Sequence, residues 1–273
     1  MKKIRVKTPA KINLTLKVGK KRSDGFHPIE SVMAAINLFD YIDIEIIEHA
    51  IGASGETKIN ISSNSNEIPH DSLNIAHKAA AAFLKMNHKI AQNIKEINIY
   101  IEKNIPVCAG LAGGSTNASG VIFALNKLFG FPLNEHQTSM VLQELGSDLN
   151  FCYEGGQKLC KGRGEILEPL EFEEIPITLI KPKNLKISAK EAYQKFDEMI
   201  NASNFPNDLE AALLPYYKEI QHLNNLGFQM SGSGPTFFAR IQFLEPALKE
   251  ELKDDYQIIE NLKTIEYGAI EAN

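Results

Sequence analysis

The feature that most constrains the fold of this chain is a glycine-rich loop that leads directly into a helix. The loop runs from Pro106 to Thr116 with the sequence PVCAGLAGGST, and apolar residues at helical spacing predict a helix from Ser115 to Gly130. Glycines let backbone amides turn inward, and a helix start adds unpaired N–H groups with a partial positive charge of roughly +0.5. The combination predicts a binding site for phosphate oxygens.

A tight turn is the plainer interpretation of the same glycines, with Ser115 or Thr116 as the helix N-cap. The sequence contains neither the terminal Gly-Lys-Ser/Thr of a Walker loop nor the GxGxxG of a Rossmann fold. Spacing alone leaves both interpretations open. A phosphate loop at this position must therefore belong to another class.

Apolar and polar residues alternate in three stretches of the first half of the chain. Ranges 4–18, 42–46 and 97–101 carry apolar residues at alternate positions, which is the period of a half-buried strand. In the first stretch, Lys11 and Asn13 share the face opposite the apolar row. These stretches predict a sheet with one face toward water.

Helical patterns lie between these strands, and several have recognisable starts. Asp71 is predicted to cap a helix that runs to Leu84. Asn134 and Gln137 have the spacing of a capping box, and Asp148 is predicted to cap a short helix. Two more helices are predicted over residues 189–199 and 208–214. The mixture predicts an α+β architecture.

Gly155 and Gly156 interrupt the helical pattern, and we expect a domain boundary there. The predicted domains are residues 1–155, which contain the phosphate loop, and residues 156–273. With 273 residues, of which 44% are apolar, the chain can bury a substantial core.

Charge and cysteine content exclude several classes of function. A net charge of −5 and a pI near 5.9 oppose a broad nucleic-acid surface. There is no run of about 18 or more apolar residues, so we expect no membrane span and a cytoplasmic protein, either monomer or homodimer. Cys108, Cys152 and Cys160 form no CxxC pair and are expected to be reduced thiols without a metal.

Pro106 to Thr116 resembles the central ATP-binding motif of the GHMP kinases, Pro-x-x-x-Gly-Leu-Gly-Gly-Gly-Ser-Ser. Segments near both ends resemble one branch of that superfamily, whose acceptor is a cytidine diphosphate-linked methylerythritol. They are Pro9–Leu14, Asp24–His27 and Met230–Pro235, with further similar stretches at Leu145–Asp148, Lys161–Glu165 and Asn207–Glu210. The motifs follow one order along the whole chain, which makes the set far more specific than any one motif.

The resemblance implies a two-domain GHMP kinase fold, with a ribosomal-protein-like βα N-terminal domain and a ferredoxin-like C-terminal domain. It also implies a reaction in which the γ-phosphoryl group of ATP, with Mg²⁺ bridging the phosphates, moves to the 2-hydroxyl of the acceptor. That reaction belongs to non-mevalonate isoprenoid precursor synthesis. The implied partners are ATP and this small molecule, without nucleic acid or membrane.

Five residues match the catalytic and acceptor positions of the family. Asp148 would accept the proton of the hydroxyl, and Lys11 would stabilise Asp148 and polarise that hydroxyl. Asn13 and Asp148 would contact the acceptor alcohol, while Phe26 would stack on the cytosine and His27 would hydrogen-bond it. Without the resemblance, Lys11 would be interpreted as a solvated charge and Asp148 as an N-cap.

The resemblance also implies the nucleotide contacts, with Ser231 to Gly234 as a second backbone wall. The implied ATP-binding residues are Lys103, Pro106, Val107, Cys108, Ala109, Gly110, Leu111, Ala112, Gly113, Gly114, Ser115 and Thr116. Ala112 stands where the family has glycine, so it is predicted to be strained if its φ is positive. Phe26, Asn150 and Ala189 replace the usual tyrosine, proline and threonine.

Two alternatives use the same loop. One is a GHMP-type kinase that acts on mevalonate, homoserine or a sugar, and Phe26 with His27 argues against it. The other is a non-catalytic nucleotide-binding or RNA-binding relative. The presence of both Lys11 and Asp148, with the acidic net charge, argues against that relative.

Overall fold

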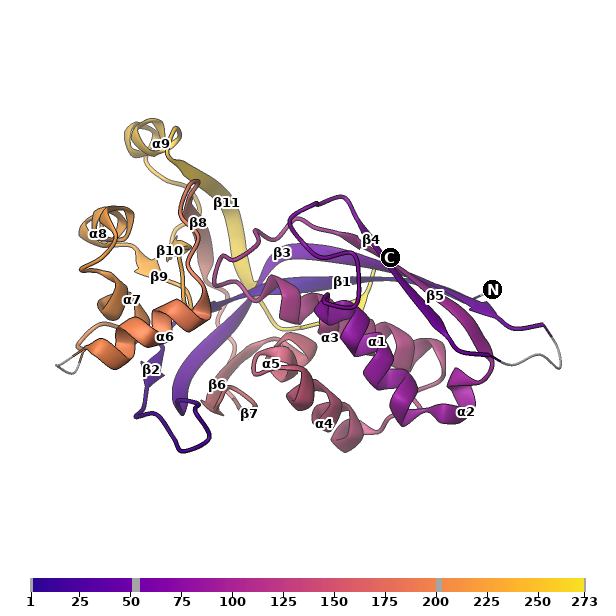
Figure 1. Cartoon of the computed structure of the whole chain (residues 1–273). Coiled ribbons are helices and arrows are strands. Elements are labelled where there is room, and N and C mark those ends of the chain that lie inside the picture. Colours follow the sequence, from indigo (N-terminus) through magenta and orange to yellow (C-terminus); the bar gives the residue numbers. More distant parts are fainter. Residues whose placement is uncertain (1, 51–54, 200–202, 273) are drawn as a thin grey trace.

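The computed structural model describes residues 2–50, 55–199 and 203–272, and its spine is one large, mainly antiparallel sheet (Figure 1). Its two longest strands, β1 (Lys2–Asn13) and β3 (Ile29–Glu48), pair antiparallel along the whole of β1. The other strands of the first part are β2 (Lys17–Val18), β4 (Lys58–Ser63), β5 (Ile94–Glu102), β6 (Gln157–Gly162), β7 (Ile166–Pro169) and the C-terminal β12 (Ile270–Glu271).

The predicted alternation along these strands is confirmed. The isoleucines of 42–46 and 97–101 are buried, because one face of the sheet is covered by helices. The residues between them are partly exposed and carry ion pairs such as Lys3 with Glu45, whose Nζ and Oε1 lie 3.0 Å apart. The first predicted strand ends at Asn13, and residues 14–16 separate β1 from β2.

Among its described residues, the N-terminal lobe has five helices. They are α1 (Ile75–Met86), α2 (His88–Ala91), α3 (Gly113–Leu128), α4 (Glu135–Leu145) and α5 (Leu149–Glu154). The central helix α3 packs closely on β1 and β3 because Gly120 has no side chain. A Cβ there would lie 2.4 Å from Thr8 Cγ2 and 2.7 Å from Ile42 Cδ1. The middle of α3 is thereby fixed against the sheet.

The C-terminal lobe extends the same sheet and carries its own helices (Figure 1). Its strands are β8 (Pro176–Pro182), β9 (Gln229–Met230), β10 (Phe237–Ala239) and β11 (Tyr256–Ile265), and its helices are α6 (Ala189–Glu198), α7 (Asp208–Leu213), α8 (Lys218–Asn225) and α9 (Pro246–Leu252). Strand β11 also pairs with β3, at Ile265 and Ala35, so the sheet joins both lobes. The α+β prediction is confirmed, and the division after residue 155 stays a prediction.

The helix starts agree with the sequence in most cases and differ in two. The capping box is confirmed, because Asn134 accepts from the N–H of Gln137 and Gln137 accepts from the N–H of Asn134. Asp71 was the wrong cap: it accepts from the N–H of Leu73 in a local turn, and Asn74 caps α1. Helix α3 begins two residues before Ser115, because the backbone already turns at Ala112. Within the described ranges, no helix has both the length and the apolar content that a membrane crossing requires.

Candidate active site

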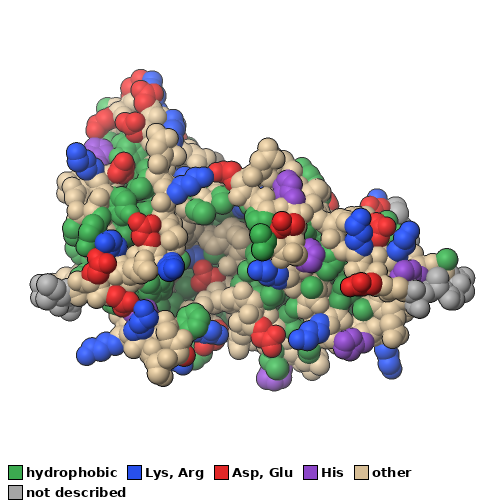
Figure 2. Space-filling view, in the orientation of Figure 1, with side chains coloured by type: hydrophobic (Ala, Val, Ile, Leu, Met, Phe, Trp, Pro, Cys, Tyr) green, Lys and Arg blue, Asp and Glu red, His purple; other side chains and the backbone are tan. Residues whose placement is uncertain are grey.

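A cleft of about 950 Å³ lies between the two lobes. Figure 2 looks into this cleft, which is visible as the hollow at the centre of the molecule. The cleft is lined by fifteen of the seventeen residues predicted for the site: Lys11, Asn13, Phe26, His27, Lys103, Pro106, Val107, Cys108, Ala109, Gly110, Ala112, Gly113, Gly114, Ser115 and Asp148. Segments far apart in the sequence therefore meet at one cavity.

The two predicted residues that do not line the cleft are Leu111 and Thr116, and both fasten the loop to β1 instead. Leu111 is buried in the core, and its carbonyl accepts from the N–H of Lys11 at 3.2 Å. Thr116 is fully buried, and its hydroxyl donates to the carbonyl of Pro9 at 2.8 Å. The carbonyl of Leu111 and the hydroxyl of Thr116 therefore hold the loop in place rather than face a ligand.

Lys11 and Asp148 come together in the cleft, as predicted. Only 4% of Lys11 is exposed, and its Nζ lies 3.6 Å from Oδ2 of Asp148. The ammonium also donates to Oδ1 of Asn13 at 2.6 Å and to the carbonyl of Gly110 at 3.2 Å. Lys11 is therefore not a solvated surface lysine, since its buried ammonium has three oxygen partners that hold it in one place.

Asp148 occupies the N-cap position of α5, but its side chain makes no capping hydrogen bond. The carboxylate is 29% exposed and points to Lys11 across the cleft. The interpretation of Asp148 as an ordinary cap is therefore wrong: the helix start places the residue, and the carboxylate stays available for chemistry.

The amide of Asn13 is held in one orientation by a chain of hydrogen bonds. Its Nδ2 donates to the hydroxyl of Ser31 at 2.8 Å, and that hydroxyl donates to the carbonyl of Thr15 at 2.6 Å. Because the amide nitrogen is fixed in this way, Oδ1 faces the ammonium of Lys11. The prediction that Lys11 and Asn13 lie on the same face of the strand is thus confirmed.

The glycine-rich loop reaches its shape through three residues with positive φ: Cys108 at 52°, Gly110 at 72° and Ala112 at 57°. Gly110 has no room for a side chain, since a Cβ would lie 2.3 Å from the carbonyl oxygen of Ser231. The hydroxyl of Ser231 also donates to the carbonyl of Gly110 at 3.1 Å. The second glycine-rich segment therefore packs directly on the first.

Ala112 has the left-handed backbone that makes an alanine strained, with φ 57° and ψ 29°. The strain for a residue with a Cβ is roughly 1 to 2 kcal/mol. We therefore expect Ala112→Gly to raise the free energy of unfolding by about 1 kcal/mol, measured by urea denaturation. The matched control is Ala109→Gly, at a buried position outside the left-handed region, which should lower it by roughly 0.5 to 1 kcal/mol. A loss of stability in both variants would contradict the strain at Ala112.

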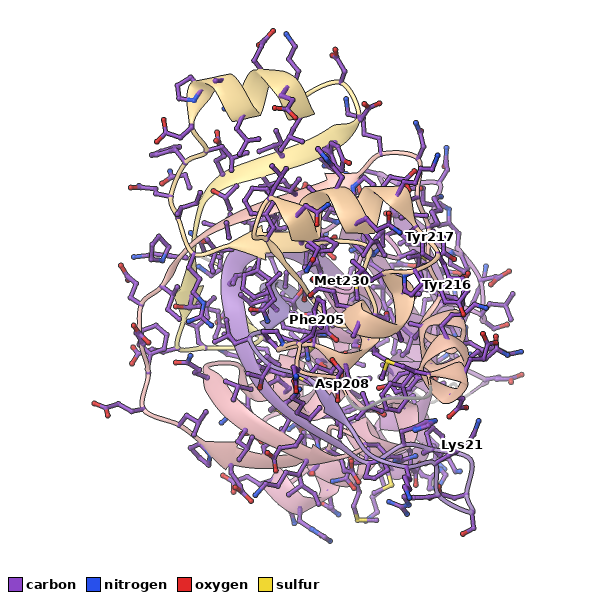
Figure 3. The ribbon with its side chains drawn as sticks, turned by 90° about the vertical axis from the view of Figure 1, so that its left-hand side faces the viewer. Lys21, Phe205, Asp208, Tyr216, Tyr217 and Met230 are labelled. Atoms are coloured by element: carbon purple, nitrogen blue, oxygen red, sulfur yellow. The ribbon has the colours of Figure 1, made fainter. Side chains whose placement is uncertain are left out.

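The second glycine-rich segment is supported from behind by Asn207. Its Nδ2 donates to the carbonyls of Met230 and Gly232, at 2.8 and 2.9 Å, while its Oδ1 caps α7. The neighbouring Asp208 accepts from Lys17 at 3.0 Å and from the N–H of Val18 at 2.9 Å. Figure 3 labels Asp208, Met230 and Phe205 in this part of the C-terminal lobe. The Asn207–Glu210 motif thus supports the wall of the cleft.

Phe26 and His27 line the cleft on the side of α6. The Phe26 side chain is 48% exposed, and the guanidinium of Arg163 lies 4.9 Å from its ring centroid. The Nδ1 of His27 lies 2.9 Å from the carbonyl of Gly19, so we assign the ring hydrogen to Nδ1. Its Nε2 lies 3.2 Å from Asp197 Oδ1, but the two are not aligned, and Nε2 has no hydrogen-bond partner among the described residues.

Three residues of this region were not predicted: Arg163, Tyr193 and Asp197. Tyr193 stacks on His27 with ring centroids 5.3 Å apart. Tyr193 and Asp197 are four residues apart on α6, so they share one face of that helix, and this spacing was available in the sequence. Arg163 belongs to the Lys161–Glu165 motif, which was noted without a role.

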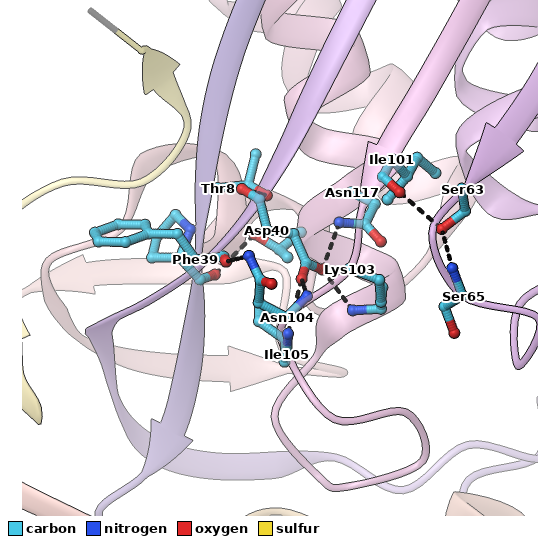
Figure 4. A network of polar contacts seen from close by, with 12 residues as sticks. Thr8, Phe39, Asp40, Ser63, Ser65, Ile101, Lys103, Asn104, Ile105 and Asn117 are labelled. Atoms are coloured by element: carbon cyan, nitrogen blue, oxygen red, sulfur yellow. Dashed lines mark hydrogen bonds and ion pairs between the residues drawn. The ribbon is translucent and has the colours of Figure 1, made fainter. Parts of the chain in front are cut away.

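Lys103 is the other buried ammonium of the cleft, with only 4% of its side chain exposed. Burial lowers the pKa of Lys103, and the carboxylate of Asp40 counteracts that effect. Figure 4 shows this pair with the backbone that follows it. Asp40 was not predicted, although its position in phase with the buried isoleucines 42, 44 and 46 was a signal available in the sequence.

The segment 74–156 matches the family model described as the GHMP kinases N terminal domain. Nearly the whole chain is similar to 4-diphosphocytidyl-2-C-methyl-D-erythritol kinases. It is 40% identical to that of Syntrophomonas wolfei, over 92% of this chain and 95% of the relative. It is 34% identical to that of Clostridium beijerinckii, over 96% of this chain and 100% of the relative.

Solved structures of related folds superpose on most of the chain. A crystal structure of 4-(cytidine 5'-diphospho)-2C-methyl-D-erythritol kinase has a TM-score of 0.75 at 24% identity and covers 96% of this chain and 99% of its own. Homoserine kinase from Cytophaga hutchinsonii has a TM-score of 0.73 at 16% identity, covering 100% of this chain and 98% of its own. Identities this low establish the fold alone, and the fold implied by the motifs is confirmed.

Proposed function

This chain belongs to the GHMP kinase family, among its 4-diphosphocytidyl-2-C-methyl-D-erythritol kinases, and from that membership we propose how its cleft performs the reaction. The enzyme is an ATP-dependent phosphotransferase of the non-mevalonate isoprenoid pathway. The observation that carries the mechanism is the contact between Lys11 and Asp148 beside the glycine-rich loop, at 3.6 Å.

The glycine-rich loop binds the phosphates of ATP in this proposal. The inward-turned backbone around Gly110 and the start of α3 at Gly113 bring N–H groups and a partial positive charge to the cleft. Lys103 adds an ammonium at the same helix start. Its Nζ lies 2.7 Å from the position that a Cβ of Gly113 would occupy. The donors are fixed before the nucleotide arrives, so binding requires little reorganisation.

Asp148 and Lys11 act on the acceptor. Asp148 takes the proton of the 2-hydroxyl as the oxygen attacks the γ-phosphorus of ATP. The new bond joins that oxygen to phosphorus, the bond from the γ-phosphorus to the bridging oxygen breaks, and ADP leaves with the bond electrons. Lys11 orients the carboxylate of Asp148 from 3.6 Å and stabilises the negative charge that develops on the attacking oxygen.

Mg²⁺ fits this cleft as an ion held chiefly by the phosphates of ATP. The described residues contain no group of three or more His, Cys, Asp or Glu side chains placed to hold a metal. Such a thin donor set suits Mg²⁺, which keeps several waters and takes few protein oxygens beside substrate phosphates. The hydroxyl of Ser115, in the cleft lining, would supply one of them. The ion would neutralise charge on the phosphates.

The cytidine group of the acceptor is recognised by Phe26 and His27. The exposed ring of Phe26 offers a stacking face, which is worth about 0.5 to 1.5 kcal/mol. In the assigned tautomer the Nε2 of His27 is an acceptor without a partner in the described chain, and the amino group of cytosine is a donor. Both contacts favour an acceptor with a pyrimidine base over mevalonate, homoserine or a sugar.

An acceptor panel tests this proposal with the purified wild-type protein. ADP release is measured with ATP and 4-diphosphocytidyl-2-C-methyl-D-erythritol, with the same methylerythritol phosphate lacking cytidine, and with mevalonate and homoserine. We expect turnover with the cytidine-linked acceptor and at least about a hundredfold lower kcat/KM with the others, since they leave the polar groups of the base site unmatched. Faster turnover of mevalonate or homoserine would contradict the proposed acceptor and identify that alcohol as the substrate instead. RNA binding without phosphoryl transfer would support the non-catalytic relative.

The domain division and the cellular location go with this function. We propose that residues 1–155 and 156–273 are the two domains, with the cleft between them, and that the enzyme works in the cytoplasm on small molecules alone. The coupled acceptor assay with purified protein and no added membrane or nucleic acid tests the last point directly.

A further inference from the structure

Asp40 is a fully buried carboxylate in a row of isoleucines. On β3 it alternates in phase with Ile42, Ile44 and Ile46, which face the helices of the N-terminal lobe, and its exposure is 0%. A carboxylate in such a position is costly unless its oxygens are fully hydrogen-bonded. A two-residue irregularity in the pairing of β1 and β3 lies just before it, where Pro9 pairs with Phe39 and the next pair is Ala10 with Ile36.

Four donors converge on this carboxylate (Figure 4). Its Oδ1 accepts the backbone N–H groups of Asn104 at 2.7 Å and Ile105 at 2.8 Å. Its Oδ2 accepts from Nδ2 of Asn117 at 2.8 Å and from the ammonium of Lys103. Residues 104 and 105 immediately precede the glycine-rich loop, and Asn117 immediately follows it. One side chain therefore ties together both ends of the loop.

The contact with Asp40 also directs the ammonium of Lys103 toward Gly113 in the glycine-rich loop. Its Nζ lies 2.7 Å from the place that a Cβ of Gly113 would occupy, at the start of α3. Lys103 and Gly113 both line the cleft, whereas Asp40 does not. The carboxylate thus acts on the cleft only through the groups that it holds.

We propose that Asp40 is a positioning residue for ATP, which fixes the two ends of the phosphate loop and aims Lys103 at the phosphates. The inference rests on the proposed nucleotide site and deepens it. The expected signature is a loss of nucleotide affinity without a loss of chemistry, because Asp40 touches neither the acceptor nor the pair formed by Lys11 and Asp148.

The first test is Asp40→Asn, which keeps the shape of the side chain and removes its charge. We expect KM for ATP to rise by about tenfold, the effect of losing the alignment of one charge-assisted hydrogen bond. The kcat and the KM for the acceptor should stay within about twofold, which is the pattern of lost uniform binding. Ile46→Val is the matched control, since it loosens the same buried row and should leave all three constants unchanged. A folded Asp40→Asn variant with wild-type KM for ATP overturns the inference.

The second test compares Lys103→Met with the double variant Asp40→Asn, Lys103→Met, in which no charge is left unpaired. Because part of the effect of Asp40 runs through Lys103, the double variant should raise KM for ATP over that of Lys103→Met by clearly less than tenfold, the remainder coming from its contacts with Asn104, Ile105 and Asn117. This comparison holds even where Asp40→Asn alone does not fold. A further tenfold rise in the double variant overturns the coupling between them. Lys103→Met with wild-type KM for ATP would instead overturn the nucleotide site itself, and the inference with it.

Discussion

Asp148→Asn is expected to lower kcat by about 10²- to 10⁴-fold, which is the contribution of a positioned general base. Asparagine keeps the size of the side chain but cannot accept a proton at neutral pH. The carboxylate makes no capping bond in α5, so its loss leaves the helix start intact. Steady-state kinetics with saturating acceptor measure kcat, and calorimetry measures the affinity for ATP, which should stay near the wild-type value.

The control for this variant is Glu154→Gln, at the other end of the same helix. Glu154 pairs with Lys158 at 3.0 Å and lies outside the cleft lining. It should keep wild-type kcat. Turnover that is unchanged in Asp148→Asn would remove Asp148 from the mechanism, whereas a loss of both turnover and ATP binding would indicate a disturbed fold.

Lys11→Met is expected to lower kcat by about 10²- to 10³-fold, comparable to the loss of one preorganised donor in other active sites. The variant removes the ammonium that lies 3.6 Å from Asp148 and leaves the carbonyl of Gly110 and Oδ1 of Asn13 without that donor. Because Lys11 contacts both the base and the phosphate loop, KM for ATP should rise as well. Steady-state kinetics with both substrates varied measure the two effects.

Lys3→Met is the matched control on the same strand. Lys3 has the same alternation phase as Lys11, but it is exposed and, among the described residues, its ion pair is with Glu45, at 3.0 Å. Its loss should change neither kcat nor KM for ATP. Wild-type kcat in Lys11→Met would contradict the assigned role, because methionine cannot stabilise charge on the attacking oxygen.

Local patterns predicted the elements that place the site. Alternation identified β1, β3 and β5, and the glycines from Gly110 to Gly114 identified the loop, because both signals depend on a few adjacent residues. The capping box at Asn134 was predicted for the same reason. The meeting of Lys11 and Asp148 was predicted from family motifs, since no local pattern relates residues so far apart.

What the sequence did not predict depends on contacts between distant segments. Lys3 and Lys11 lie in the same row of β1, yet one is exposed and the other buried, because only the end of β1 is covered by the two glycine-rich segments. Alternation places Asp40 on the face toward the helices and Asp43 on the face toward Arg5, but the partners that hold the Asp40 carboxylate, Lys103 and Asn117, come from distant segments. Tertiary packing, rather than residue type, decides both cases.

The carbonyl of Gly110 joins segments of the chain that are synthesised at very different times. It accepts from Lys11, 99 positions earlier in the chain, and from Ser231, 121 positions later. Contacts that span so much sequence form late, since the chain must first close large loops. On the ribosome, a nascent chain that has not yet emerged past residue 231 lacks both the segment that packs on Gly110 and strand β12, which pairs with β1. Phosphotransfer therefore becomes possible only near the end of synthesis.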